Sequence, residues 1–328
     1  MNRRGMRWMT RLNLSLAAAL VAAMAASLVA GKIWVPPGVW ASDDPRWLII
    51  AQLRMPRTLL AAMVGAGLGL SGAAMQGYLR NPLADPGLFG VSAGAALGAV
   101  LSLFAGVAAP GWLLPACALA GAALTMAVLA LIVGRSASMV VFALAGVIIS
   151  SLAGSLTALT ISLAPTPFAT AQIITWLMGA LTDRSWADVA LAGPIIALGA
   201  AVLAMAARPL DALTLGETAA RTMGVDTRRL QWQIVLGVGL CVGACVAVAG
   251  VIGFVGLIVP HLVRPLAGHR PGAVLLPSAL GGAVLLVGAD ALVRAAPMVS
   301  ELRLGIAMSM LGGPFFLMML VRMRRGLA

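Results

Sequence analysis

The sequence predicts an all-α membrane protein, a polytopic bundle of about ten transmembrane helices with both termini in the cytoplasm. Three observations predict it. Hydrophobic residues make up 61% of the 328 residues and charged residues only 10%, which is more apolar surface than a soluble core of this size can bury. Long windows lack any Asp, Glu, Lys or Arg, and the basic residues gather at the ends of these windows.

Most of the uncharged windows are about as long as one membrane-spanning helix, which needs roughly 20 residues. They are residues 12–31, 58–79, 86–134, 136–182, 189–207, 230–263, 271–289 and 304–321. No linker, tail or fixed-period repeat divides the chain, so we expect a single transmembrane domain over residues 1–328.

We assign the windows to helices in chain order. Window 12–31 follows a basic start but is longer than the apolar core of a signal peptide, so we expect an uncleaved first span. Window 58–79 holds the second span. Window 86–134 is long enough for two spans and is broken around Pro110 and Gly111.

Window 136–182 holds one span, because the segment Ala-Pro-Thr-Pro at 164–167 ends a helix. The remainder of that window is too short to cross. The later windows hold one span each, except 230–263, which is short for two spans and long for one.

The distribution of positive charge settles that case. Arginines at both chain ends keep those ends in the cytoplasm, so the number of spans is even. We therefore expect ten, with one full span and one short, broken span in 230–263. Of the 22 Lys and Arg residues, 15 then fall in loops assigned to the cytoplasm and 7 in loops assigned to the outside. The same distribution argues against a nucleic-acid-binding surface despite the net charge of +12.

Enzymatic chemistry has little support in the sequence. Residues 90–94 match the G-x-S-x-G pattern of serine hydrolases, but a serine nucleophile needs a base within hydrogen-bond reach. The only histidines, His261 and His269, follow the spans that hold the serines. No P-loop is present, so the chain cannot bind ATP by that route.

A resident metal or a coupling ion is also poorly supported. Cys241 and Cys245 share a helix face without a nearby His or acid, and we interpret them and Cys117 as small packing residues. An ion-coupled carrier usually holds ionisable residues at mid-membrane. Here Asp290 is the only acid inside a span-like run, and Arg294, one turn on, predicts a local ion pair.

The longest charged segment, residues 208–229, predicts a cytoplasmic elbow. Thr214 and Glu217 form a T-x-x-E capping box at a helix start. Glu217 and Arg221 are spaced to pair on one helix face. An ordinary inter-span loop that happens to be helical is the alternative.

The end of the elbow shows how the chain re-enters the membrane. Gly224 fits the left-handed position that ends a helix, and Asp226 or Thr227 can cap the next one. Earlier in the chain, Pro82 and Pro86 stiffen the polar segment 77–87 between the second and third spans. A non-helical turn there must face protein or a water-filled cavity.

Several stretches together resemble one family, the permease subunits of binding-protein-dependent ABC importers for iron-siderophores, haem and vitamin B12 (the FecCD type). They are RMPRTLLAAMVGAGLGLSGAAMQGYLRNPLADPGLFGVSAGAALGAV at 54–100, WLMGALTDRSW at 176–186, LTLGETAARTMGV at 213–225, VIGFVGLIVPHLVR at 251–264 and ELRLGIAMSMLGGPFFLMMLV at 301–321. They occur in the family's order and cover most of the chain after residue 50.

The resemblance implies a non-catalytic permease of the bacterial inner membrane, with ten spans and a homodimeric or pseudo-dimeric pore. It implies two cytoplasmic ABC ATPase subunits, which bind ATP and Mg²⁺, and a periplasmic substrate-binding protein. No cofactor bound by this chain and no nucleic acid are implied. A carrier or channel without an ATPase is the alternative from another class.

The resemblance also gives residues their expected roles. Asn81 and Leu83 would narrow the inner end of the pathway as a cytoplasmic gate. Arg54, Arg57 and Arg294 would receive the binding protein, against the alternatives of lipid anchoring or the local Asp290–Arg294 pair. The ATPase-coupling residues would be Leu213, Leu215, Gly216, Glu217, Ala219, Ala220, Met223 and Gly224.

Two positions depart from the family's pattern: Ala180, where Ser is frequent, and Arg303, where Pro is common. Neither changes the expected function, and Arg303 adds a positive charge on the outer side. For the cargo we rank iron chelates, including haem, first and cobalamin second, on a thin likeness of the 81–92 segment to haem and B12 permeases.

Overall fold

The computed structural model describes residues 3–106, 111–133, 139–297 and 301–325. Within these residues the chain is helical and forms no strand, as the composition predicts. The helices are α1 Arg3–Val29, α2 Met55–Tyr78, α3 Val91–Phe104, α4 Leu113–Val133, α5 Met139–Ser162, α6 Pro167–Leu177, α7 Trp186–Met205, α8 Ala207–Leu213, α9 Glu217–Thr222, α10 Thr227–Ala249, α11 Val255–Val263, α12 Pro271–Ala295 and α13 Leu304–Arg325. Short turns of other helix types lie at Pro37–Val39, Ile49–Arg54 and Pro86–Phe89.

Eight of the described helices are long and apolar enough to cross a membrane: α1, α2, α4, α5, α7, α10, α12 and α13. Two shorter apolar helices, α3 and the nine-residue α11, lie among them. Together they correspond to the ten predicted spans, although the number that crosses stays a prediction. The Ala-Pro-Thr-Pro segment does end α5, and α6 after it has only 11 residues.

The predicted division of window 230–263 is confirmed. Helix α10 ends at Gly250, whose φ of +68° is left-handed, and α11 begins only after Phe254, which also has a φ of +68°. The backbone between them leaves the helical path. The window therefore holds one full-length helix, α10, and one short helix, α11.

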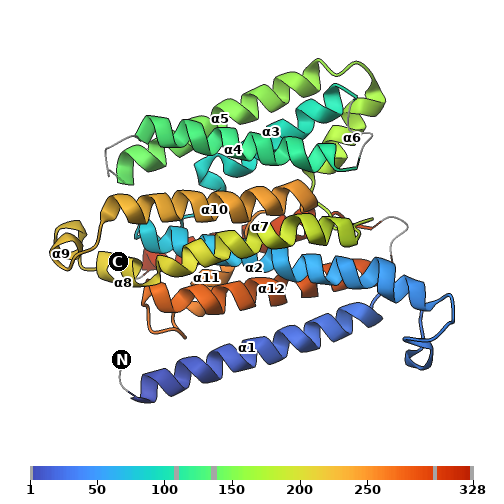
Figure 1. The fold of residues 1–328 in the computed structure, drawn as a ribbon, viewed down its shortest axis with the longest axis horizontal. Coiled ribbons are helices and arrows are strands. Elements are labelled where there is room, and N and C mark those ends of the chain that lie inside the picture. The colour runs from blue at the N-terminus through green and yellow to red at the C-terminus, as the bar shows by residue number, and fades with distance from the viewer. Residues whose placement is uncertain (1–2, 107–110, 134–138, 298–300, 326–328) are drawn as a thin grey trace.

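The helices form layers with α2 near the centre (Figure 1). Helices α3, α4 and α5 lie on one side of α10 and α7, and α1 lies on the other side beyond α12. In α2, 83% of the apolar window is buried, against 6% in α1. Helix α2 is therefore a core helix of the bundle, whereas α1 presents its surface outward.

Small residues allow the closest helix contacts, as the glycine spacing predicts. A Cβ atom on Gly65 of α2 would stand 2.3 Å from the carbonyl oxygen of Gly282 on α12, and one on Gly98 of α3 would stand 2.1 Å from that of Cys117 on α4. Neither position can accept a larger side chain unless the backbones move apart.

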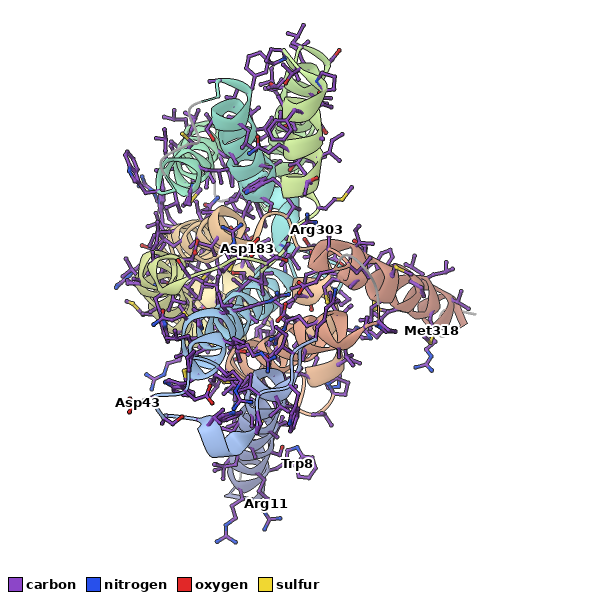
Figure 2. The ribbon with its side chains drawn as sticks, turned by 90° about the vertical axis from the view of Figure 1, so that its right-hand side faces the viewer. Trp8, Arg11, Asp43, Asp183, Arg303 and Met318 are labelled. Carbon is purple, nitrogen blue, oxygen red and sulfur yellow. The ribbon has the colours of Figure 1, made fainter. Side chains whose placement is uncertain are left out.

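The two ends of the bundle differ in what they carry. Both marked chain ends lie at the end that holds α8 and α9, and the segment between α1 and α2 lies at the other (Figure 1). We refer to these as the elbow end and the outer end. Seen from the outer end, α13 projects away from the remaining helices, with Met318 on its far part (Figure 2).

Candidate functional site

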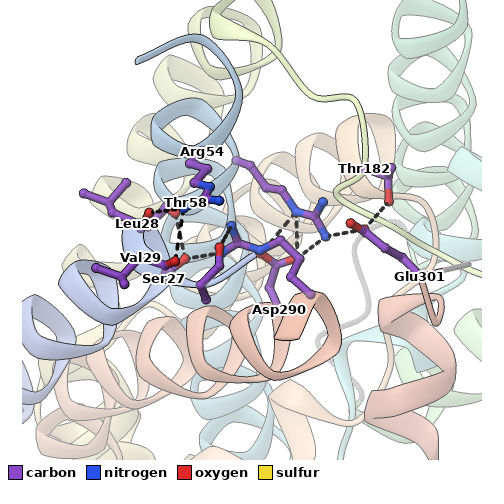
Figure 3. A network of polar contacts seen from close by, with 11 residues as sticks. Ser27, Leu28, Val29, Arg54, Thr58, Thr182, Asp290 and Glu301 are labelled. Atoms are coloured by element: carbon purple, nitrogen blue, oxygen red, sulfur yellow. Dashed lines mark hydrogen bonds and ion pairs between the residues drawn. The ribbon is translucent and has the colours of Figure 1, made fainter. Parts of the chain in front are cut away.

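Two arginines at the start of α2, Arg54 and Arg57, meet the distant Arg294 of α12 in a network of polar contacts at the outer end (Figure 3). Arg57, near the start of α2, donates to Oδ1 of Asp290 on α12 from Nε at 3.0 Å and from Nη2 at 2.9 Å. The same Nη2 lies 2.9 Å from Oε2 of Glu301, just before α13. One guanidinium thus bridges α2, α12 and the segment that enters α13.

A second guanidinium shares the same carboxylate. Arg294 Nε lies 3.0 Å from Asp290 Oδ2, so the predicted local ion pair is present. Arg294 also donates to the hydroxyl of Ser27 on α1, and the Ser27 hydroxyl lies 2.7 Å from that of Thr58 on α2. The cluster therefore ties α1 to α2 and α12.

The third arginine holds the end of α1. Arg54 Nη1 donates to the carbonyl oxygens of Leu28 at 2.8 Å and Val29 at 3.1 Å. These are among the last carbonyls of α1, which have no partner within the helix. Arg54 thereby supplies a cap that the sequence reasoning did not foresee.

The three arginines are buried, with exposed fractions of 6% for Arg54, 9% for Arg57 and 5% for Arg294. The docking role predicted for them stays a prediction, but each already has partners inside the chain. They still border a cavity of about 250 Å³, which Lys32, Asp183, Arg184 and Glu301 also line. Positive charge exceeds negative charge around this cavity, so an acidic side chain from outside is the group it would attract.

Glu301 is the charged member of the cluster that sequence reasoning missed. Burial raises the pKa of Glu301, but hydrogen bonding to Arg57 and the charge of that guanidinium outweigh it, so the pKa is lowered. Thr182 donates a further bond at 3.3 Å. Glu301 lies 244 positions from Arg57 in the chain, and no local pattern connects them.

The predicted gate segment forms a compact turn between α2 and α3. The Asn81 side chain accepts a hydrogen bond from the backbone N–H of Leu83 at 2.9 Å, and Asp85 accepts one from Gly87 at 2.8 Å. Asn81 is exposed and Leu83 half-buried. The turn rests on α11, since a Cβ on Gly256 would stand 2.7 Å from Pro86. Its role as a gate stays a prediction.

The buried side-chain amide of Gln76 joins α2 to the start of α11. Gln76 of α2 donates to the carbonyl oxygens of Gly256 at 3.4 Å and Leu257 at 3.3 Å, and it accepts from Arg264 at 2.8 Å. These carbonyls lie in the first turn of the short helix. No local pattern indicates this contact, because its partners are about 180 residues apart.

The elbow has the predicted bend but not the predicted capping box. Helix α8 runs to Leu213, and Thr214 follows it with helical backbone angles, so its hydroxyl donates back to the carbonyl of Asp211 at 2.7 Å. An N-cap needs an extended backbone. Instead α9 begins after Gly216, whose φ is +98°.

A second elbow expectation is also wrong: Glu217 and Arg221 form no ion pair among the described residues. The other two expectations for the elbow, the Gly224 bend and the cap on α10, are confirmed. Gly224 has a φ of +85°, and the Asp226 carboxylate caps α10 by accepting from the backbone N–H of Arg228 at 2.9 Å and of Arg229 at 3.0 Å.

The predicted coupling residues differ in how far they are exposed on the surface of the chain. Leu213 and Ala220 are buried in the chain's own core, so they are not available to a partner. Leu215 and Met223 are exposed by 65% and 62%. Gly216, Glu217 and Ala219 are half-buried and Gly224 is exposed. Of the predicted apolar contacts, Leu215 and Met223 are therefore the ones that present free surface for docking.

Two cavities flank the elbow, of about 460 Å³ and about 440 Å³, and Arg208, Ala212 and Met223 line both. Asp211 fixes the elbow to α12: it accepts from Arg270 at 2.6 Å and from the backbone N–H of Gly272 at 2.8 Å. Sequence reasoning missed this tie.

No metal centre is assembled in the described part of the chain, where no three His, Cys, Asp or Glu residues come together. The two cysteines of α10 each face a backbone carbonyl, Cys241 that of Ile196 and Cys245 that of Val64, both at 3.6 Å. This is the packing role predicted for them.

Comparison with known proteins assigns the class of this helix bundle. Residues 19–322 match the FecCD transport family. A solved transporter assigned to the metal-chelate type of ABC transporters, in an inward-facing conformation, superposes with a TM-score of 0.88 at 30% identity, covering 95% of this chain and 99% of that one. The bundle is thus the fold of an ABC transporter permease.

Curated relatives agree over nearly the whole chain. The uncharacterized ABC transporter permease protein YvrB of Bacillus subtilis (strain 168) is 42% identical over 296 residues, 88% of this chain and 83% of that protein. The vitamin B12 import system permease protein BtuC is 39% identical in Klebsiella pneumoniae over 326 residues (98% and 96%) and in Salmonella typhi over 329 residues (98% and 97%). The chain belongs to the FecCD transport family and is a multi-pass membrane permease of an ABC importer.

Proposed function

We propose that the chain forms the membrane pathway of an importer that moves an iron chelate, a siderophore complex or haem, from periplasm to cytoplasm across the bacterial inner membrane. The match of residues 19–322 to the FecCD family carries this proposal, together with the superposition on a metal-chelate type transporter. The chain itself does no covalent chemistry. ATP and Mg²⁺ are bound by partner ATPase subunits.

Cobalamin is the second candidate cargo. The BtuC relatives favour it, because they are 39% identical over almost the full length of both chains. Cobalamin and haem are both large metal chelates built on a tetrapyrrole-like ring. A pathway shaped for one needs little change to pass the other, so the binding protein is expected to make most of the selection.

The assembly we propose has two copies of this permease, two ATPases and one binding protein. Helices α5 and α13 support the pairing of permeases, because both carry many exposed apolar residues and α13 projects from the bundle (Figure 2). In a lipid bilayer such faces can also contact lipid, so the oligomeric state in nanodiscs is the discriminating measurement.

Each end of the bundle has a proposed partner. The elbow offers Leu215 and Met223 beside its two cavities to the ATPase. The outer end offers the basic cavity of Arg54, Arg57 and Arg294 to acidic side chains of the binding protein. At the elbow end, Asn81 and Leu83 are proposed as the inner gate.

Reconstitution tests this function. The permease is inserted into liposomes with its ATPase and binding protein, and uptake of haem, a ferric siderophore and cyanocobalamin is compared with and without ATP. We expect ATP-dependent uptake that an ATPase lacking its P-loop lysine abolishes. Flux driven by an ion gradient in liposomes that hold the permease alone would contradict the proposal.

A further inference from the structure

A second cavity lies at the outer end. It has a volume of about 400 Å³ and lies where three helices are interrupted: between α6 and α7, between α10 and α11, and just before α13. We call it the outer pocket. Its lining residues are Phe168, Ala171, Gln172, Thr175, Trp176, Ala180, Thr182, Asp183, Arg184, Ala249, Gly250 and Arg303.

Irregular backbone forms one wall of the outer pocket. The N–H of Ala180 donates to the carbonyl of Ala249 at 2.8 Å, and the N–H of Gly305 donates to that of Gly179 at 3.2 Å. These bonds join the three interruptions to one another. In a membrane protein, non-helical backbone is tolerated where it is buried in protein or lines a cavity, and transporters bind their cargo at such helix breaks.

Arg303 distinguishes the pocket electrostatically. Among the residues that the structure describes it forms no hydrogen bond or ion pair through its side chain, although it is partly buried. Arg46, Arg57, Arg184 and Arg294 at the same end all have a carboxylate partner. Arg303 is thus a guanidinium with free donors at the border of a cavity.

Further donors and aromatic side chains surround it. The indole N–H of Trp176 is buried and has no hydrogen-bond partner within the described part of the chain, and Gln172 and Thr175 on the same helix line the pocket. Phe168 lies at the pocket with 77% of its surface exposed. The wall therefore combines an aromatic surface with hydrogen-bond donors that lack acceptors.

Asp183 is the one acid in the lining, and it forms no ion pair with Arg303 (both are labelled in Figure 2). A left-handed backbone, with φ at +58°, holds it in place. The negative charge of Asp183 repels an anionic ligand and attracts the Arg303 guanidinium. A variant without this charge is therefore an informative control.

We propose that the outer pocket binds an anionic metal chelate, with Arg303 holding an ionised carboxylate and the aromatic wall contacting a flat conjugated ring. This rests on the proposed import function and narrows its cargo. A guanidinium that has no acceptor among the described residues can take one from a ligand, and a carboxylate supplies a charge-assisted hydrogen bond that a neutral group does not. The pocket therefore selects between two cargoes of equal shape by their charge.

Two probes of the same shape test the inference: zinc protoporphyrin IX, which has two carboxylates, and its dimethyl ester, which has none. Binding to the full permease in lipid nanodiscs is measured by fluorescence, and empty nanodiscs correct for partition into lipid. We expect the diacid to bind at least ten times more tightly than the diester, because a hydrogen bond to a charged group changes affinity by about 10- to 100-fold.

Variants locate the effect. Arg303→Gln should remove the preference for the diacid while leaving diester affinity unchanged, which also shows that the variant is folded. Arg303→Lys should keep part of the preference, and Asp183→Asn should strengthen diacid binding a few-fold. Arg46→Gln, an exposed arginine outside the pocket, is the matched control and should change neither affinity.

The inference is overturned if the wild-type permease binds neither probe, if both bind equally, or if Arg303→Gln weakens both probes alike. It is also overturned if Asp183→Asn weakens the diacid, because Arg303 would then act with Asp183 as a structural pair. These binding measurements need no ATPase. Failure of ATP-dependent uptake with charge-selective binding intact would contradict the import function and leave the pocket standing.

Discussion

At the outer end of the bundle, charged side chains are buried against one another, whereas at the elbow they face outward and backbone turns set the shape. The outer cluster depends on Asp290, fully buried between Arg57 and Arg294. The elbow depends on Gly216, Gly224 and the Asp226 cap. We therefore expect the outer cluster to be sensitive to the removal of one charge. We expect the elbow to tolerate changes to its charged residues other than Asp226, but not to its turns.

The largest expected effect comes from removing the shared carboxylate. Asp290→Asn leaves two buried guanidinium groups without their common partner, and breaking a buried ion pair in this way costs about 3–5 kcal/mol. Thermal unfolding of the detergent-solubilised protein measures the loss. The control is Asp188→Asn, which breaks the more exposed pair with Arg184 and should cost about 1 kcal/mol or less. Equal losses for the two variants would mean that the outer cluster does not stabilise the bundle.

The next prediction separates folding from coupling at the elbow. Ala220 is fully buried and Leu215 is 65% exposed. Ala220→Asp places an unpaired charge in the core and should destabilise the chain by several kcal/mol. Leu215→Asp should leave the melting temperature within a few degrees of the wild type and still disconnect ATP hydrolysis from uptake, because the charge would lie in the interface with the ATPase.

The melting temperature, the substrate-stimulated ATPase activity and the uptake rate of both variants distinguish a role in folding from a role in coupling. Thr218→Asp, at an exposed position on α9 close to Leu215 in the chain, is a control for the mere addition of charge. Uptake by Leu215→Asp at the wild-type rate would remove the elbow from the ATPase interface.

These contacts show where prediction from sequence succeeds and where it stops. The uncharged windows located every long helix, and Pro and Gly located the end of α5, because membrane length and backbone sterics act locally. Gly224 and Asp226 were predicted for the same reason. Thr214 was not, because whether it precedes one helix or follows another depends on where α8 ends, and no local pattern indicates that it ends at Leu213.

Most of the outer cluster could not be predicted, since its partners come from α1, α2, α12 and the start of α13. The Asp290–Arg294 pair was foreseen because it lies within one turn of one helix. The contact of Asp290 with Arg57 spans 233 positions and needs the folded bundle. The burial of Leu213 and Ala220 was missed likewise, because the face of a short helix that turns inward is set by its neighbours.

A smaller effect is expected on docking of the binding protein. If Arg57 and Arg294 receive its acidic side chains, Arg57→Glu and Arg294→Glu should slow association about 10-fold at low salt and less at high salt, because rim charges act mainly on the association rate and are screened. Surface plasmon resonance across an ionic-strength series measures the rate. Arg208→Glu, at the elbow end, is the control that should change nothing.

Because both arginines belong to the buried cluster, a slower rate alone could reflect damage to the outer end. A Glu→Arg change on the binding protein that restores the rate of the Arg57→Glu permease distinguishes contact from damage. An unchanged rate at low salt for both variants would remove the cluster from the docking surface and leave it a purely structural role.

The smallest effect concerns acid, and it again separates the two ends. The pKa of Glu301 is lowered in the folded chain, mainly through Arg57 acting against burial, relative to about 4.3 in an unfolded chain. Its contribution to stability is therefore present above the unfolded pKa and is lost as pH falls through the lowered folded value.

Because Glu301 is partly exposed, we expect Glu301→Gln to cost about 1 kcal/mol or less at neutral pH and nothing in strong acid. Glu217→Gln at the elbow is the matched control, because Glu217 has no ion pair to lose among the described residues. Unfolding of all three proteins in urea at a series of pH values measures the difference. If Glu301→Gln lowers the free energy of unfolding by the same amount below the folded pKa, Glu301 stabilises the outer end through its shape and hydrogen bonds rather than its charge.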